Sequence, residues 1–512
     1  MSKSHTRISR RAMLAGAASL PLLPGAAQAQ QKVLTIGSAF SPISLDPSLS
    51  GNGRAGMAVI PAYEPLIRTA PDGSYRAALA TAWEMAPDSK SVVFTLRQDA
   101  RFSDGDPVTA EAAKKSIDYF RTKKGGPFAT NLQTVTAIDV LDPYRFKITL
   151  SAPQPGLVTL FDSYWNGGLI ISPKGVDNPD MLARETRGAG PYKLDPAATI
   201  AGKSYTYVPN EHYYDKRRVK WDKVVISVFE DQNAGIQAMK AGQLKLLSSD
   251  PFTGNANAAN LPKDLRIVSD PVGWTGLVMN DRDGEVQPYL KDVRVRQAIN
   301  YALDRKLINK ALFGKFADPS DQLQSKGFMG YDAKNEERYP YDPEKAKALL
   351  KEAGYANGFE LKVAYVNNTM SQFLQQALSG QLRKVGITVK PMEAQSFGAL
   401  RTMADNKAFA AIIVNSNSGV PNLAKFQTLD PRGSFNQYGS KDATLTRLMD
   451  EASNLPLSQA GEAWKKAYAH VVEIAWFAVV SAIHVVYFAS STIKTPAIGQ
   501  SIVMDLTDVE PA

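Results

Sequence analysis

The alternation of apolar and polar residues is clearest in the middle of the chain. Val272 to Met279 is rich in β-forming residues and predicts a strand. After a polar segment, Asp292 offers a helix N-cap, and apolar residues then recur at helical spacing, at Val295, Ala298, Ile299, Ala302 and Leu303. Asp304 can cap a second, short helix that Gly314 would end. A strand passing directly into a helix near mid-chain predicts the crossing from one α/β unit to the next.

The same patterns predict alternating strands and helices on either side of this crossing. Early elements are a strand at residues 33–37, another at 91–97, and a helix capped by Thr109. Later strands are expected at 361–366, 387–392 and 408–414, and later helices at 343–353, 370–385 and 444–453. Ala475 to Ala489 is almost wholly apolar but short for a bilayer and contains His484, so we expect a buried strand.

The N-terminus has the features of an export signal. Arg10 and Arg11 precede an apolar run from Ala12 to Ala27, and Ala27-Gln28-Ala29 is a small-x-small cleavage site. Residues 1–29 are therefore interpreted as a signal similar to the twin-arginine type, with an ordinary secretory signal as the alternative. No Cys follows the run, so we expect a periplasmic, soluble chain without a lipid anchor.

Composition narrows the classes of function. With 44% hydrophobic and 21% charged residues, the 512-residue chain is of ordinary globular composition, and its length fits about three domains. The net charge is +9, but the Lys and Arg residues are scattered among acidic residues and form no long basic block, so nucleic acid is not an expected partner. The chain contains no Cys, which excludes disulfides, thiol catalysis and Cys-ligated metals.

No catalytic constellation is found in the sequence. The four His residues show no H-E-x-x-H spacing, and there is no G-x-S-x-G elbow or Walker sequence. The G-x-G-x-x-G match at residues 51–56 lies too far behind its strand for a dinucleotide site, and Asp104-Gly105-Asp106 fits a turn. We expect no catalytic residues, no metal and no cofactor, although a Ser-Lys or carboxylate-pair enzyme stays open.

Several segments, in this order, resemble the solute-binding proteins of peptide-type ABC importers. They are YEPL (63–66), VVFTLRQDARFSDGDPVTAEAAKKSIDYF (92–120), GAGPYKL (188–194), DVRVRQAINYALDR (292–305) and YDPEKAKALLKEAGY (341–355). This family, often called family 5, includes binders of dipeptides, oligopeptides, opines, nickel chelates and glutathione. The resemblance covers most of the chain after the signal.

The resemblance implies a two-lobed α/β periplasmic-binding-protein fold of type II, with an extra inserted domain and a hinge between the lobes. Lobe 1 would comprise residues 30–273, with an inserted subdomain at about 66–187. Lobe 2 would comprise 274–482, and 483–512 would return to lobe 1. Such proteins close by hinge bending around the solute. The expected partners are a small solute and the ABC permease, and the working form is expected to be a monomer.

Clefts that bind small solutes need aromatic walls and a few oriented polar groups. Trp274 is the first candidate because it lies where the chain would enter lobe 2, although a strand Trp is as often part of a core. The loop-like Tyr164 and Trp165 come second. Phe40 and Ser41, which follow the first strand, come third.

Asparagines provide a further set of candidates. Peptide-binding relatives usually have Gly-Trp-x-x-Asp at the matching place, and the Asp pairs with the ligand's α-ammonium. Here Gly-Trp is replaced by Ile413-Val414, and the Asp falls on Asn417, which supplies no charge. We hypothesise a polar solute, neutral or anionic, hydrogen-bonded by Asn415, Asn417 and Asn436. An exported hydrolase or a chaperone on the same scaffold is the alternative function.

Overall fold

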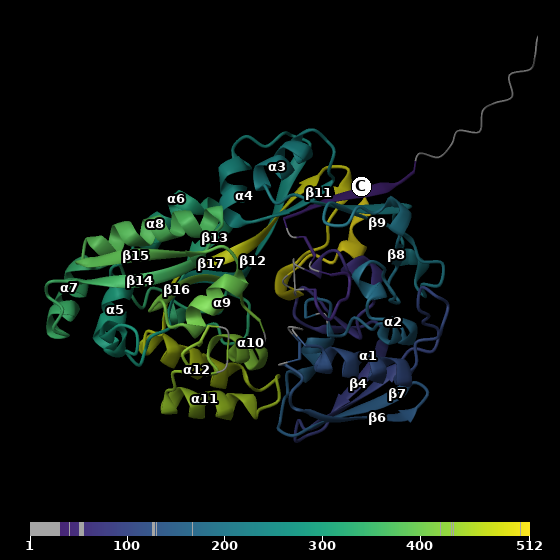
Figure 1. The fold of residues 1–512 in the computed structure, drawn as a ribbon, viewed down its shortest axis with the longest axis horizontal. Coiled ribbons are helices and arrows are strands. Elements are labelled where there is room, and N and C mark those ends of the chain that lie inside the picture. The colour runs from purple at the N-terminus through teal and green to yellow at the C-terminus, as the bar shows by residue number, and fades with distance from the viewer. Residues whose placement is uncertain are drawn as a thin grey trace, which may run out of the picture.

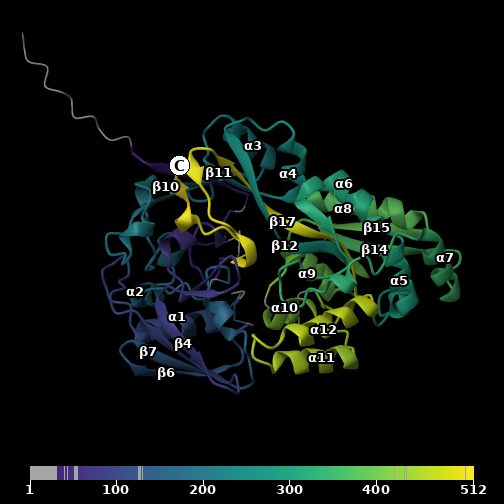
Figure 2. The same ribbon diagram turned by 180° about the vertical axis from the view of Figure 1, so that it is seen from behind.

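Two α/β lobes make up the computed structural model (Figures 1 and 2). It describes residues 31–512 except 40, 43, 51–55, 125–127, 130, 166, 420, 432, 434 and 502. For residues 422 and 423 it describes the backbone but not the side chains. The residues after β17, drawn in yellow, lie against the first lobe (Figure 1). The two-lobed α/β fold is thus confirmed. Among the described helices, none is long and apolar enough to cross a membrane.

One sheet, eleven-stranded within the described residues, runs through both lobes. In the first lobe its strand order is β11-β1-β10-β9-β8. These strands are β1 (Val33–Ser38), β8 (Tyr192–Leu194), β9 (Ser204–Pro209), β10 (Lys223–Val228) and β11 (Leu246–Ser249). β1 pairs in parallel with both β10 and β11, which α3 (Gln232–Lys240) connects, and α4 (Pro251–Ala258) follows.

Two long antiparallel strands connect the lobes: β12 (Leu265–Met279) and β17 (Phe477–Ser490). Their pairing is shifted by irregularities between Pro271 and Gly273 and between Thr275 and Gly276. A Cβ atom on Gly276 would lie 2.4 Å from the carbonyl oxygen of Ala478, so only glycine allows this close approach. Tyr487 packs in the core of the first lobe and Ala478 in that of the second. β17 therefore passes from one lobe to the other.

The second lobe continues the sheet in the order β15-β14-β16-β12. Its further strands are β13 (Ala317–Pro319), β14 (Phe359–Val366), β15 (Ile387–Ala394) and β16 (Ala411–Asn417). Its helices are α5 (Val293–Tyr301), α6 (Arg305–Leu312), α7 (Pro343–Glu352), α8 (Thr369–Arg383), α9 (Phe397–Asp405), α10 (Pro421–Thr428), α11 (Ala443–Ser453) and α12 (Gly461–Glu473). Two apolar clusters form the core of this lobe.

A separate four-stranded antiparallel sheet, in the order β4-β5-β7-β6, belongs to the first lobe. Its strands are β4 (Ala80–Met85), β5 (Ser91–Leu96), β6 (Val135–Asp142) and β7 (Arg145–Leu150). α1 (Ala110–Thr122) contacts β6 and β7, and the short α2 (Pro173–Asp177) contacts α1. A small hairpin of β2 (Ile67–Thr69) and β3 (Tyr75–Ala77) precedes this sheet. It brings Thr69 and Tyr75 side by side.

The predicted helix starts are confirmed at atomic detail. The side chains of Thr109, Asp292 and Asp304 each accept a hydrogen bond from a backbone N–H in the first turn of the following helix. The predicted buried strand at 475–489 is β17. β12 starts earlier than predicted because its first residues are only half-buried and show no apolar pattern. The boundaries assigned to the lobes stay predictions.

Candidate functional site

A cavity of about 280 Å³ lies between the two lobes. The first lobe contributes residues of the β2–β3 hairpin, of the segment 159–165 and of the C-terminal segment; the second contributes short segments of three loops. The lining residues are Thr69, Gly73, Tyr75, Thr159, Asp162, Tyr164, Trp165, Phe328, Met329, Gly419, Leu457, Ser458, Gln500 and Ser501. A site shared between lobes is suited to a ligand that holds the lobes together.

Aromatic side chains of the first lobe form one wall of this cavity. A 3₁₀ turn, Leu157–Phe161, is fully buried and anchors the loop that carries Tyr164 and Trp165. Their rings meet edge to face, with centroids 5.3 Å apart. The hydroxyl of Tyr75 is hydrogen-bonded to that of Thr159, which holds the hairpin against this loop. The two aromatic residues proposed from the loop pattern therefore both line the cavity.

Asn417 joins the lobes directly. Its side-chain amide, at the end of β16, donates a hydrogen bond of 2.5 Å to the hydroxyl of Tyr164 in the first lobe. Asn415, two residues earlier on the same strand, is exposed and accepts a hydrogen bond from the hydroxyl of Thr275. The structure thus has the lobes in contact across the cleft, with Asn417 at the contact.

Two other candidates lie inside the second lobe, away from the cavity. Asn436 is fully buried: its oxygen accepts a hydrogen bond from Arg282, and its amide donates to two backbone carbonyls. Trp274 is 2% exposed and packs edge to face against Phe435 and Phe477. These contacts explain both residues as packing groups, which for Trp274 is the alternative stated from the sequence.

The third pair of candidates adds little to the site. Ser41 is exposed and does not belong to the described lining of the cavity. Phe40 lies outside the described residues. Among the described residues, no group of three or more His, Asp or Glu side chains could hold a metal ion.

Asp162 was missed by sequence reasoning. It directly follows the buried 3₁₀ turn, is 4% exposed and lines the cavity. One carboxylate oxygen accepts a hydrogen bond from the Thr69 hydroxyl at 2.7 Å, and the other from the backbone N–H of Trp165 at 3.0 Å. Burial raises the pKa of this carboxyl to about 6. An Asp before two aromatic residues is too common a pattern to have indicated this environment.

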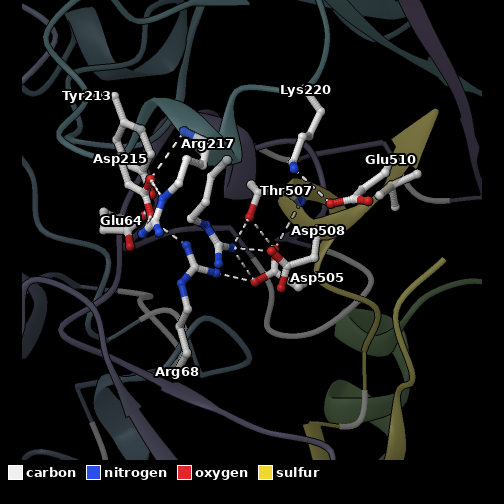
Figure 3. Close-up of polar contacts among 12 residues, drawn as sticks. Glu64, Arg68, Tyr213, Asp215, Arg217, Lys220, Asp505, Thr507, Asp508 and Glu510 are labelled. Atoms are coloured by element: carbon white, nitrogen blue, oxygen red, sulfur yellow. Dashed lines mark hydrogen bonds and ion pairs between the residues drawn. The ribbon is translucent and has the colours of Figure 1, made fainter. Parts of the chain in front are cut away.

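A second compartment of about 260 Å³ adjoins the first and shares Thr69, Asp162 and Ser501 with it. Its other charged residues are Arg68, Arg76, Arg218, Asp505 and Asp508. Figure 3 shows Arg68 between Glu64 and Asp505, with ion pairs to both. Arg218 also pairs with Asp505. Although burial opposes ionisation, the two guanidiniums lower the pKa of Asp505 to about 2. This network fastens the C-terminal segment to the first lobe.

Comparisons of sequence agree with this architecture. Residues 74–432 match the family model of bacterial extracellular solute-binding proteins, family 5 Middle. A glutathione-binding protein, GsiB of Salmonella paratyphi A, is 27% identical over 385 residues, which are 74% of this chain and 72% of that protein. The probable D,D-dipeptide-binding periplasmic protein DdpA of Escherichia coli is 28% identical over 373 residues, which are 70% of this chain and 69% of that protein.

Solved structures show the same fold at lower sequence identity. The periplasmic binding protein AgaA of A. tumefaciens R10, in complex with agropinic acid, matches with a TM-score of 0.79 and 23% identity, covering 94% of this chain and 99% of that one. The binding protein DppA of Helicobacter pylori, in complex with the peptide STSA, matches with a TM-score of 0.78 and 20% identity, covering 94% and 98%. Both are two-lobed periplasmic binding proteins.

Proposed function

Since this chain belongs to the bacterial extracellular solute-binding proteins of family 5, we propose that it binds a small, polar, peptide-like or opine-like solute in the cavity between its lobes. As a member of that family it is the solute-binding component of an ABC importer, with a small solute and a permease as partners. Its known relatives are binding proteins and not enzymes. Export by the signal at residues 1–29 is part of the proposal.

The observation that carries the proposal is the cavity lined from both lobes. Its volume, about 280 Å³, lies just below the usual range for small-molecule pockets, roughly 300–1,000 Å³. That size suits a dipeptide or an amino-acid conjugate better than an unfolded chain, which a chaperone would need to hold. Tyr75, Tyr164 and Trp165 supply the aromatic wall that such a pocket requires.

Lobe closure follows from the way the lobes are connected. β12 and β17 cross between the lobes, and their irregular pairing near Gly273 and Gly276 is a place where the sheet can bend. The Asn417–Tyr164 hydrogen bond forms only when the lobes come together. A solute in the cavity contacts both lobes and therefore favours the closed form over the open one. The closed form would then be delivered to the permease.

A thermal-shift screen of the purified exported chain tests this function. The panel contains dipeptides, tripeptides, glutathione and agropinic acid, with mono- and disaccharides as unrelated solutes. At least one member of the first group should raise the unfolding temperature in a saturable manner, because a ligand that binds only the folded state stabilises it. Stabilisation by saccharides alone would contradict the proposed solute class. Chemical conversion of a bound solute would instead support the alternative function, an exported hydrolase.

A further inference from the structure

Asp162 lies in the wall shared by the two compartments of the cleft. It is 4% exposed, so its carboxylate has lost nearly all contact with bulk water. Its hydrogen-bond donors, the Thr69 hydroxyl and the backbone N–H groups of Trp165 and Tyr164, are all neutral. An ionised carboxylate has about four acceptor positions, so these three hydrogen bonds leave it short of saturation. The side chain can therefore still accept hydrogen bonds from a molecule in the cavity.

The protein itself supplies no counter-charge for this carboxylate. Within the described residues, no Lys, Arg or His side chain forms an ion pair with Asp162. Asp505, in the adjoining compartment, has two arginine partners by contrast. A buried carboxylate without a cation is costly, and burial accordingly raises its pKa to about 6. At neutral pH the group is still mostly ionised and unpaired.

We propose that Asp162 is the anchor for a cationic nitrogen, an ammonium or a guanidinium, of the transported solute. This assignment rests on the proposed function and specifies its solute class. An ammonium bound there would form charge-assisted hydrogen bonds in a site shielded from water. The rings of Tyr164 and Trp165, which line the same cavity, can add cation–π attraction. The positive charge of the solute thus pairs with the Asp162 carboxylate, for which the described part of the protein provides no cation.

The anchor also accounts for the neutral side chain at position 417. Asn417 brings no charge to the cavity, and its amide binds Tyr164, which is two residues from Asp162. The negative charge that faces the solute is therefore supplied by the first lobe instead of the second. A solute that is neutral or anionic overall, yet carries an ammonium, is compatible both with the negative charge of Asp162 and with the uncharged side chain of Asn417. Arg76, in the adjoining compartment, is exposed and can pair with a carboxylate of the same solute.

The test compares solutes that differ only in their basic nitrogen. The probes are Ala-Ala and glutathione with their N-acetylated counterparts, titrated calorimetrically into the exported chain. Asp162→Asn is the test variant, and Asp88→Asn is the control. Asp88 is an exposed acid of the first lobe that also accepts a backbone N–H, at 3.0 Å from Lys90, but lies outside the described lining of the cavity.

Wild type and D88N should bind a free-amine probe roughly 10- to 100-fold more tightly than its acetylated partner, the range for a hydrogen-bonded charge. D162N should lose that preference. Equal binding of the pair by wild type overturns the proposal whatever the variants do, and so does an unchanged preference in D162N with a native circular dichroism spectrum.

If no probe binds, the proposal is decided by a second measurement. Protein is taken from its native source, and the solute that it releases is identified by mass spectrometry. A solute with a basic nitrogen supports the anchor, and one without a basic nitrogen overturns it. No released solute and no binding probe would refute the proposed function itself, and the anchor with it. Failure of the anchor alone is distinct, because a solute is then bound without regard to its nitrogen.

Discussion

Replacing Asp162 by Asn is expected to stabilise the solute-free protein at neutral pH while it impairs binding. The Asn oxygen can still accept the Trp165 backbone N–H, and its amide can donate to the Thr69 hydroxyl, so both of these hydrogen bonds can be kept. What the substitution removes is a desolvated charge. A residue that lowers stability where the ligand binds is a common compromise between stability and function.

The size of the effect follows from the pKa of Asp162, which burial raises from 3.8 to about 6. Each pKa unit corresponds to about 1.4 kcal/mol between protonation states, so ionised Asp162 costs the fold up to about 3 kcal/mol. Because the folded-state pKa is the higher one, this cost is absent below pH 4 and complete above pH 6. Asp505 in the adjoining compartment, with its pKa near 2, does not titrate in that range.

Scanning calorimetry of wild type and D162N at pH 4 and pH 8, without solute, measures the difference. At pH 8 the variant should unfold several degrees higher, since about 1 kcal/mol corresponds to about 2–4 °C for a domain of 150–250 residues. At pH 4 the two proteins should unfold at nearly the same temperature. A variant that is less stable at pH 8, or a difference that does not change with pH, would refute the reasoning.

Three further substitutions probe the closed form, the lobe crossing and the C-terminal network. Tyr164→Phe removes the hydroxyl that accepts the hydrogen bond from the second lobe, so calorimetry should give roughly 2- to 10-fold weaker solute binding, while Tyr144→Phe, in the same lobe but outside the described cavity lining, should bind as wild type. Gly276→Ala places a methyl group 2.4 Å from a carbonyl oxygen of β17 and should lower stability by about 1–3 kcal/mol in urea unfolding. Gly380→Ala, in α8 with nothing within 4 Å, should instead raise stability by roughly 0.5–1 kcal/mol; the same sign at both positions would contradict the packing account. Asp505→Asn leaves the buried Arg68 and the half-buried Arg218 without this partner and should cost about 3–5 kcal/mol by thermal unfolding. Because the pKa of Asp505 is lowered, the higher stability of wild type over Asp505→Asn should disappear as the pH falls from 4 toward 2. If the variant unfolds at the same temperature as wild type at pH 7, the network does not stabilise the fold.

Sequence patterns predict this fold well wherever the determinants are local. A capping side chain and an apolar face lie within one turn of each other, so the helices after Thr109, Asp292 and Asp304 were located correctly. The start of β12 was not, because a half-buried strand at the edge of a lobe mixes polar and apolar residues without a period.

The site was predictable only in part, because segments far apart in the chain build it. Tyr164 and Trp165, which were proposed because they are aromatic residues in a loop-like segment, do line the cavity, and their role in binding stays a prediction. A strand pattern does not tell which neighbours cover Trp274, and a loop pattern does not show that Asn436 is enclosed by backbone groups. The environment of Asp162 depends on Thr69, which lies in another hairpin, and was therefore hidden from any local reading.

Small-angle X-ray scattering tests the central claim, that the two lobes close around a solute, most directly. The structure has the lobes in contact through Asn417 and Tyr164 and thus corresponds to the closed form. Solute-free protein should give a larger radius of gyration than the structure does, and saturation with the solute that stabilises it most should reduce the radius to the structure's value. A profile that stays the same at saturation, with binding established by calorimetry, would contradict the claim.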